Sequence, residues 1–163
     1  MPQTLSIHTI GHSDHTTAAF IDLLRQHDVT LVVDVRSQPY SRWAPQFNRE
    51  TLRHSLQKAG IAYRFLGDAL GGRPSDMELY TAGRPDYRRM EQTDVYRRGI
   101  ERVLELARTE CVAMMCGEAD YQQCHRHLLI AQTLLRRGVN VLLIKPDGRT
   151  VQAESTPEQL SLF

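Results

Sequence analysis

The alternation of short apolar runs with longer amphipathic segments is the feature that most constrains the fold of this chain. Buried strands are predicted at five runs that are β-branched or continuously apolar: 5–10, 31–35, 62–66, 112–115 and 139–144. Helices are predicted from apolar stripes at 16–27, 48–59, 96–108 and 120–135. Strands that alternate with helices pair in parallel through right-handed crossovers. We therefore expect an α/β fold of three layers, with a mainly parallel five-stranded sheet and helices on both faces.

The length of 163 residues is close to the ~150 residues of a typical domain. We expect a single α/β domain over residues 1–147 and a tail over residues 148–163, because the chain becomes polar after Pro146. The segment 67–94 is rich in Gly, Pro, Asp and Arg, and we expect it to form a long functional loop or lid.

The sequence gives no sign of a membrane or of export. No apolar run approaches the ~18–20 residues that cross a bilayer. Residues 1–9 lack the basic and apolar regions of a signal peptide. The three cysteines are then expected to be reduced thiols rather than a disulfide framework. We expect a cytoplasmic protein.

The net charge of +1 does not by itself indicate binding to a polyanion. The ratio of arginine to lysine is unusual, because only Lys58 and Lys145 are lysines and the other 18 basic residues are arginines. A GC-rich genome would produce this bias, and so would recognition of anions or phosphate. From Arg36 to Arg64 the chain carries six basic residues and one acid, Glu50, which predicts a local patch that could bind nucleic acid.

Polar side chains follow four of the five predicted strands. In a parallel sheet, ligands bind beyond the carboxyl ends of the strands, so these residues are expected to share one site. After the first two strands come Gly11, His12, Ser13, Asp34 and Arg36. After the third and fourth come Gly71, Gly72, Arg73, Cys116, Glu118, Cys124, His125 and Arg126.

Each of these residues also has a plainer interpretation. Asp34 and Arg36 could form a structural ion pair, His12 could bond its own loop, and the two glycines could make a tight turn. Near a helix start, the macrodipole and Arg126 would stabilise a Cys124 thiolate, but this residue could equally be a small core hydrophobe. No CxxC pair occurs, and the adjacent Cys124 and His125 would point to different faces of a helix, so neither a metal nor a cofactor is expected.

Cys116 directly follows a buried strand, which is where rhodaneses and Cys-dependent phosphatases place their nucleophile. Asp34-Val35-Arg36 also resembles the Asp-x-Arg of rhodaneses. Those enzymes need an Arg six residues after the Cys, whereas this chain has Gln122 there. The resemblance is therefore one of architecture.

A set of ordered motifs resembles one bacterial family, labelled domain of unknown function 488. These motifs are Thr9-Ile10-Gly11-His12-Ser13, Asp34-Val35-Arg36 with Pro39 and Ser41, Tyr63 before Leu66-Gly67, Leu70-Gly71-Gly72, and Met115-Cys116-Gly117-Glu118 leading to Cys124-His125-Arg126. The resemblance covers roughly residues 7–146. It implies that these residues form a shared pocket, and it brings no established reaction.

The last five residues, Gln159, Leu160, Ser161, Leu162 and Phe163, resemble the pentapeptide by which bacterial replication and repair proteins dock on the sliding clamp. Gln159 would bond in a polar subsite, and the three apolar side chains would fill apolar ones. The free energy gained by burying three apolar side chains only slightly exceeds the entropic cost of ordering five residues. We therefore expect a weak, roughly micromolar contact. A tail folded back on its own domain is the alternative.

Taken together, we expect an enzyme, of the hydrolase class, that acts on nucleic acid or a nucleotide-like phosphate substrate in DNA repair or replication. Two alternatives are Cys-dependent sulfur or phosphoryl transfer on a small molecule, and a non-catalytic adaptor between DNA and the clamp. The expected catalytic residues are His12 and Glu118 as acid or base, Cys116 or Cys124 as nucleophile, and His125. The expected substrate-binding or anion-binding residues are Ser13, Asp34, Arg36, Gly71, Gly72, Arg73 and Arg126.

Overall fold

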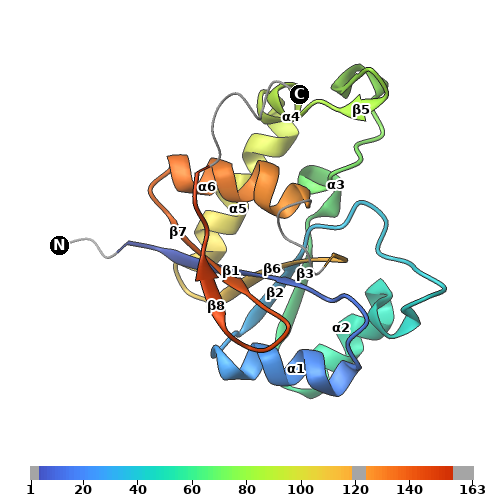
Figure 1. Ribbon diagram of the computed structural model, residues 1–163, viewed down its shortest axis with the longest axis vertical. Helices are drawn as coiled ribbons and strands as arrows, with labels where there is room; N and C mark the ends of the chain where they lie inside the picture. The colour runs from blue at the N-terminus through green and yellow to red at the C-terminus, as the bar shows by residue number, and fades with distance from the viewer. Residues whose placement is uncertain (1–3, 119–123, 156–163) are drawn as a thin grey trace.

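A computed structural model describes residues 4–118 and 124–155 of the chain, with the backbone only for 126–128. Its main sheet has six strands among these residues, in the spatial order β3-β2-β6-β1-β7-β8 (Figure 1). The strands in that order are β3 (Ala62–Phe65), β2 (Leu31–Asp34), β6 (Val112–Cys116), β1 (Ser6–Gly11), β7 (Asn140–Ile144) and β8 (Thr150–Gln152). The first five pair in parallel, and β8 is antiparallel to β7.

The parallel strands lie where the apolar runs predicted them, whereas the expected count of five strands was one too low. The sixth strand, β8, lies in the segment 148–163 that we expected to be a tail. Two of its three residues, Thr150 and Gln152, are polar and exposed, so it lacks the apolar signal of a buried strand. A tight turn, in which the Lys145 N–H donates to the Arg149 carbonyl at 2.8 Å, folds it back onto β7.

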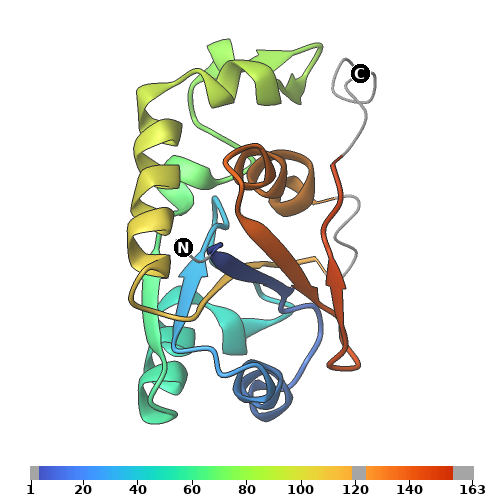
Figure 2. The same cartoon turned by 90° about the vertical axis from the view of Figure 1, so that its left-hand side faces the viewer.

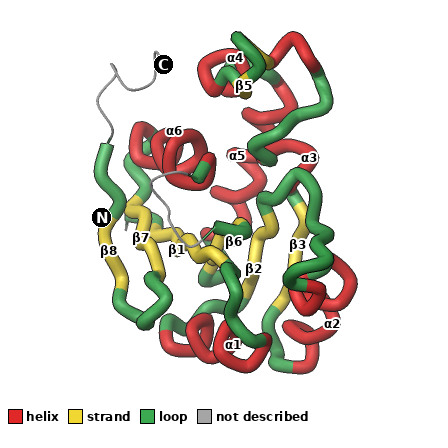
Figure 3. Tube along the Cα trace, turned by 45° about the vertical axis from the view of Figure 1, so that its right-hand side comes forward, coloured by secondary structure: helices red, strands yellow, loops and turns green. Residues whose placement is uncertain are grey.

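Helices cover both faces of the sheet, as expected for three layers (Figure 3). On one face lie α1 (Thr17–Gln26) and α2 (Arg49–Lys58), which bury Phe20, Leu24, Leu52 and Leu56. The other face is covered by α3 (Gly67–Leu70), α5 (Asp94–Ala107), the π-helical turn η4 (Arg126–Ala131) and α6 (Gln132–Arg136). Each face therefore has its own apolar core.

The helix starts follow from capping side chains. Thr16 Oγ1 accepts from the Ala19 N–H and Thr93 Oγ1 from the Tyr96 N–H, which satisfies one unpaired backbone donor at each start. Asn48 also precedes a helix, but its Oδ1 accepts from the Ser41 N–H instead, at 2.7 Å. Asn48 therefore holds the preceding loop rather than capping α2.

The segment 67–94 contains several short elements and is more ordered than the long loop that we expected. After α3 come the single turn η2 (Met77–Leu79), a hairpin of β4 (Tyr80–Thr81) and β5 (Arg84–Pro85), and α4 (Tyr87–Glu91). Figure 2 shows this hairpin at one end of the long helix α5. A further single turn, η1 (Pro45–Phe47), precedes α2.

The helix expected over 120–135 is described only in its second half, as η4 and α6. The first residues of that expected helix, 120–123, lie outside the described residues. Among the helices that the structure describes, none is long and apolar enough to cross a membrane.

Candidate functional site

The candidate site lies at the carboxyl edge of the sheet, where β1, β6 and β2 end side by side. The strand register pairs Gly11 with Cys116 and Asp34 with Met115. Just beyond the strands, the His12 N–H donates to the Cys116 carbonyl at 2.9 Å. Residues that follow different strands in the sequence therefore meet at one edge, which is where parallel sheets bind ligands.

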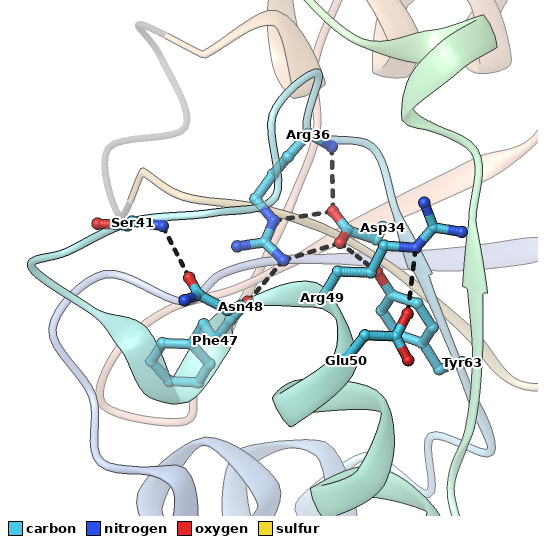
Figure 4. A network of polar contacts seen from close by, with 8 residues as sticks. All are labelled: Asp34, Arg36, Ser41, Phe47, Asn48, Arg49, Glu50 and Tyr63. Atoms are coloured by element: carbon cyan, nitrogen blue, oxygen red, sulfur yellow. Dashed lines mark hydrogen bonds and ion pairs between the residues drawn. The ribbon is translucent and has the colours of Figure 1, made fainter.

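A buried ion pair between Asp34 and Arg36 occupies the part of this edge that faces α2 (Figure 4). The guanidinium is bidentate, with Nε 2.9 Å from Oδ1 and Nη2 2.8 Å from Oδ2. The Arg36 N–H donates to Oδ1 at 3.1 Å, and the Tyr63 hydroxyl donates to Oδ2 at 2.5 Å. Nη2 also donates to the Phe47 carbonyl at 2.7 Å.

These contacts favour the structural interpretation of the pair. The Asp34 carboxylate accepts four hydrogen bonds, so its buried charge is fully compensated. Burial and the Asp34 charge raise the pKa of Tyr63, which therefore stays a hydrogen-bond donor at neutral pH. Of the guanidinium nitrogens of Arg36, only Nη1 donates to none of the described residues. Little of Arg36 is left to hold a substrate anion.

His12 lies beside this pair and is also buried. Its ring stacks on Phe47 with the centroids 4.5 Å apart, and its Nδ1–H donates to the Ser13 carbonyl at 2.9 Å. Burial lowers its pKa, and the Arg36 charge lowers it further, so the ring is neutral at pH 7. A neutral ring with a protonated Nδ1 leaves Nε2 as a base. Ser13 adopts a left-handed backbone with φ 47°, and its hydroxyl lies 3.4 Å from Asp14 Oδ1.

Two cysteines and a histidine form a second group, on the opposite face of the sheet. Sγ of Cys116 lies 2.9 Å from Sγ of Cys124, and the two residues are only 2% and 3% exposed. Nδ1 of His125 lies 3.8 Å from Sγ of Cys124. The Cys116 thiol is also 3.7 Å from the carbonyl of Glu118, whose side chain is exposed.

The tautomer of His125 follows from its other nitrogen. Nε2 lies 3.0 Å from the Val35 carbonyl, which can only accept, so Nε2 carries the proton. In the neutral ring, Nδ1 then presents its lone pair to Cys124. The arrangement allows the thiol of Cys124 to pass its proton to His125, which is how an adjacent base activates a cysteine.

The glycines expected to bind an anion are explained by close packing. A Cβ added at Gly72 would lie 2.7 Å from Cγ of His125, and one added at Gly71 would collide with the Ser37 side chain. The Arg73 N–H donates to Ser37 Oγ at 2.8 Å. This segment therefore holds His125 and the end of β2 in place, as a tight turn would.

Tyr87 packs against the apolar core that contains both cysteines, and it is not among the predicted site residues. Burial raises the pKa of its phenol, and the nearby charges of Cys124 and Glu118 raise it further. The positive charge of Arg73, whose side chain is exposed, lowers the pKa of the same phenol. Tyr87 comes from α4, far along the chain from both cysteines, and no pattern in the sequence distinguishes it from other tyrosines.

The predicted residues thus meet at one edge but form two groups. His12, Asp34 and Arg36 lie toward α1 and α2, and the two cysteines and His125 lie toward α3 and α5. Val35 joins the groups, since it lies between Asp34 and Arg36 and its carbonyl accepts from His125. The side chain of Arg126 lies outside the described atoms. No cluster of three metal-ligating side chains occurs among the side chains that the structure describes.

Comparison with known proteins identifies a family. The matching family model is described as Domain of unknown function DUF488, and it covers residues 16–133, well over half of the chain. The chain belongs to this family. No curated protein and no solved structure matches it.

The DUF488 match confirms the resemblance drawn from the motifs, within narrower limits than residues 7–146. It includes the Asp34 pair, the glycines and both cysteines of the site, but begins after His12 and Ser13. The clamp-like pentapeptide at 159–163 lies beyond the match and outside the described residues, and docking on the clamp stays a prediction.

Proposed function

We propose that this DUF488 protein is a cysteine-dependent enzyme whose reaction is exchange at a sulfur atom. The observation that carries the proposal is the contact of 2.9 Å between Sγ of Cys116 and Sγ of Cys124 beside Nδ1 of His125. A disulfide bond is about 2.05 Å long, so the two sulfurs need to approach by less than about 1 Å to react.

In the first step, Cys124 is the nucleophile, because it is the cysteine that contacts the imidazole. Its proton moves to Nδ1 of His125, and the thiolate attacks one sulfur of a donor R–S–S–R′. A bond forms between Sγ of Cys124 and the R–S group, and the S–S bond of the donor breaks. The leaving R′S⁻ takes the proton from His125 and departs as a thiol.

In the second step, Cys116 resolves the intermediate. Its sulfur attacks Sγ of Cys124, the Cys116–Cys124 disulfide forms, and RS⁻ leaves with the proton that Cys116 gives up. The cysteine pair loses two electrons, and the donor gains them as it becomes two thiols. A persulfide donor, in which R is hydrogen, follows the same path and releases hydrogen sulfide.

Two features favour sulfur exchange over phosphoryl transfer. A phosphatase holds its substrate with a ring of amides and an arginine, whereas Arg36 is occupied by Asp34 and Phe47. A second thiol in contact with the nucleophile has no role in phosphoryl transfer. In sulfur exchange it is the group that releases the product.

The test uses oxidised glutathione as the donor, followed by acid quenching, alkylation and mass mapping of the cysteines. The wild-type protein should form the Cys116–Cys124 disulfide, with a mass loss of about 2 Da for the two hydrogens. Cys116→Ser should stop at a glutathione adduct on Cys124. Cys111→Ser is the matched control, because Cys111 directly precedes β6, at its opposite end. Adducts on Cys111 alone, or no adduct in Cys116→Ser, would contradict the proposal.

A second candidate function is the one expected from the sequence, action on nucleic acid or a nucleotide-like substrate. The observation that favours it is the exposed positive charge of the segment 36–64. Arg42, Lys58 and Arg64 are exposed, and none of them forms an ion pair with a described residue. Recruitment to DNA by the sliding clamp through residues 159–163 would accompany this function and is tested separately below.

A further inference from the structure

The loop between β2 and α2 holds two exposed aromatic side chains on an ordered backbone. The Ser41 N–H donates to Asn48 Oδ1 at 2.7 Å (Figure 4). The Ser41 hydroxyl oxygen also accepts from the Trp43 N–H, at 3.0 Å. The Arg49 N–H donates to the Pro39 carbonyl at 2.9 Å, which closes the loop at its base. The conformation of residues 39–49 is therefore fixed by the loop's own hydrogen bonds.

This fixed loop directs its aromatic side chains into solvent. Trp43, the single tryptophan of the chain, is 92% exposed, and Tyr40 is 63% exposed. Pro39, Ala44 and Phe47 of the same loop are buried, so the loop does bury apolar side chains where they can reach the core. Large aromatic side chains left outside by an ordered loop indicate a surface on which something stacks.

The charge of the loop indicates what that partner is. Arg42 lies between the two aromatic residues, is exposed, and forms no ion pair with a described residue. From Arg36 to Arg49 the sequence contains no Asp or Glu. Alternating aromatic and basic side chains suit a polymer with flat bases and a negative backbone. A protein partner would call for a continuous apolar surface, whereas polar Ser41 and charged Arg42 stand between these two aromatic residues in the sequence.

We propose that the loop 39–44 binds single-stranded nucleic acid, with bases stacked on Trp43 and Tyr40 and a phosphate held by Arg42. Stacking requires an accessible base face, which a duplex does not offer along its length. The loop follows β2 and Val35, the first residue after that strand, whose carbonyl accepts a hydrogen bond from His125. A bound strand would therefore lie at the same edge of the sheet as the cysteine pair. This inference rests on the second candidate function and not on the sulfur chemistry.

The test is a titration of the full-length protein with single-stranded oligothymidylate of about 16 nucleotides, at about 50 mM salt. Because Trp43 is the only tryptophan, quenching of the intrinsic fluorescence reports directly on this loop. Anisotropy of a labelled oligonucleotide gives the affinity of variants that lack the tryptophan. Oligouridylate and a DNA duplex are run in parallel to separate DNA, RNA and double-stranded binding.

We expect quenching with either single strand and about tenfold weaker binding in Trp43→Ala, the loss typical of one stacked base. Trp43→Phe should recover most of the affinity, because a phenyl ring also stacks. Arg42→Gln should weaken binding and reduce the slope of log affinity against log salt concentration by about one, the value for one phosphate contact. Met77→Ala, which removes an exposed apolar side chain elsewhere, is the matched control and should bind as the wild type does.

Three results would overturn the proposal: no binding of either single strand at this salt, equal affinity in Trp43→Ala, or tighter binding of the duplex. The Cys116→Ser/Cys124→Ser double variant should bind the oligonucleotide normally, and Trp43→Ala should keep the glutathione reaction. Loss of one activity without the other thus separates failure of this inference from failure of the sulfur chemistry.

Discussion

Replacement of Arg36 by Met tests whether the Asp34–Arg36 pair is structural. The substitution removes three hydrogen bonds from a guanidinium and leaves a fully buried carboxylate with the Tyr63 hydroxyl and one backbone N–H. Breaking a buried pair in this way costs about 3–5 kcal/mol. In a domain of this size, a loss of that magnitude lowers the melting temperature by about 6–20 °C. Calorimetry and urea unfolding measure the loss independently.

Arg53→Met is the matched control. Its guanidinium lies 3.4 Å from Glu50, but the Arg53 side chain is 61% exposed, so its removal should cost less than about 1 kcal/mol. Addition of Asp34→Asn to Arg36→Met removes the uncompensated charge and should recover part of the lost stability. If Arg36→Met destabilises the protein no more than Arg53→Met does, the structural interpretation is wrong, and Arg36 becomes a candidate for substrate binding.

Three further predictions concern the two groups of the site and the tail. The pKa of His12 should lie below its ordinary value of 6.5, so the free energy of unfolding should fall as the pH drops from about 6.5 toward that lowered pKa. A proton NMR titration measures the pKa, and His12→Gln should flatten the dependence of stability on pH. Gly72→Ala should displace the His125 ring and slow adduct formation at the nucleophilic cysteine, and an unchanged rate would refute the contact. A peptide of residues 155–163 should bind the sliding clamp with roughly micromolar affinity. Alanine at Leu162 and Phe163 should abolish that binding without altering the protein's melting temperature; a lower melting temperature would place both side chains in its own core.

The sheet was largely predictable because its parallel strands are buried on both faces and so appear as continuous apolar runs. Val32 and Val33 of β2, or Ala113 and Met114 of β6, are fully buried whichever face they point to. The edge strand β8 escaped prediction because it pairs with one neighbour only and keeps two of its three residues exposed. Such a strand carries no apolar pattern.

The site was predictable as a location and not as an arrangement. Strand ends placed Asp34 and Cys116 at one edge, but the face that each side chain takes depends on register. Met115 pairs with Asp34, which puts Cys116 on the opposite face. The sequence leaves the register between strands so far apart in the chain undetermined. The contact between Cys116 and Cys124 could not be predicted either, because it depends on the path of the chain between them.

The most direct test of the central claim, an activated Cys124 beside Cys116, is the rate of iodoacetamide labelling of each cysteine against pH. We predict that Cys124 labels in the native protein with a midpoint well below the value of about 8.5 for an ordinary thiol. His125→Phe should move that midpoint upward, while Cys111 keeps its own profile in both proteins. If Cys116 and Cys124 label only after denaturation, they are core residues and the sulfur chemistry is wrong.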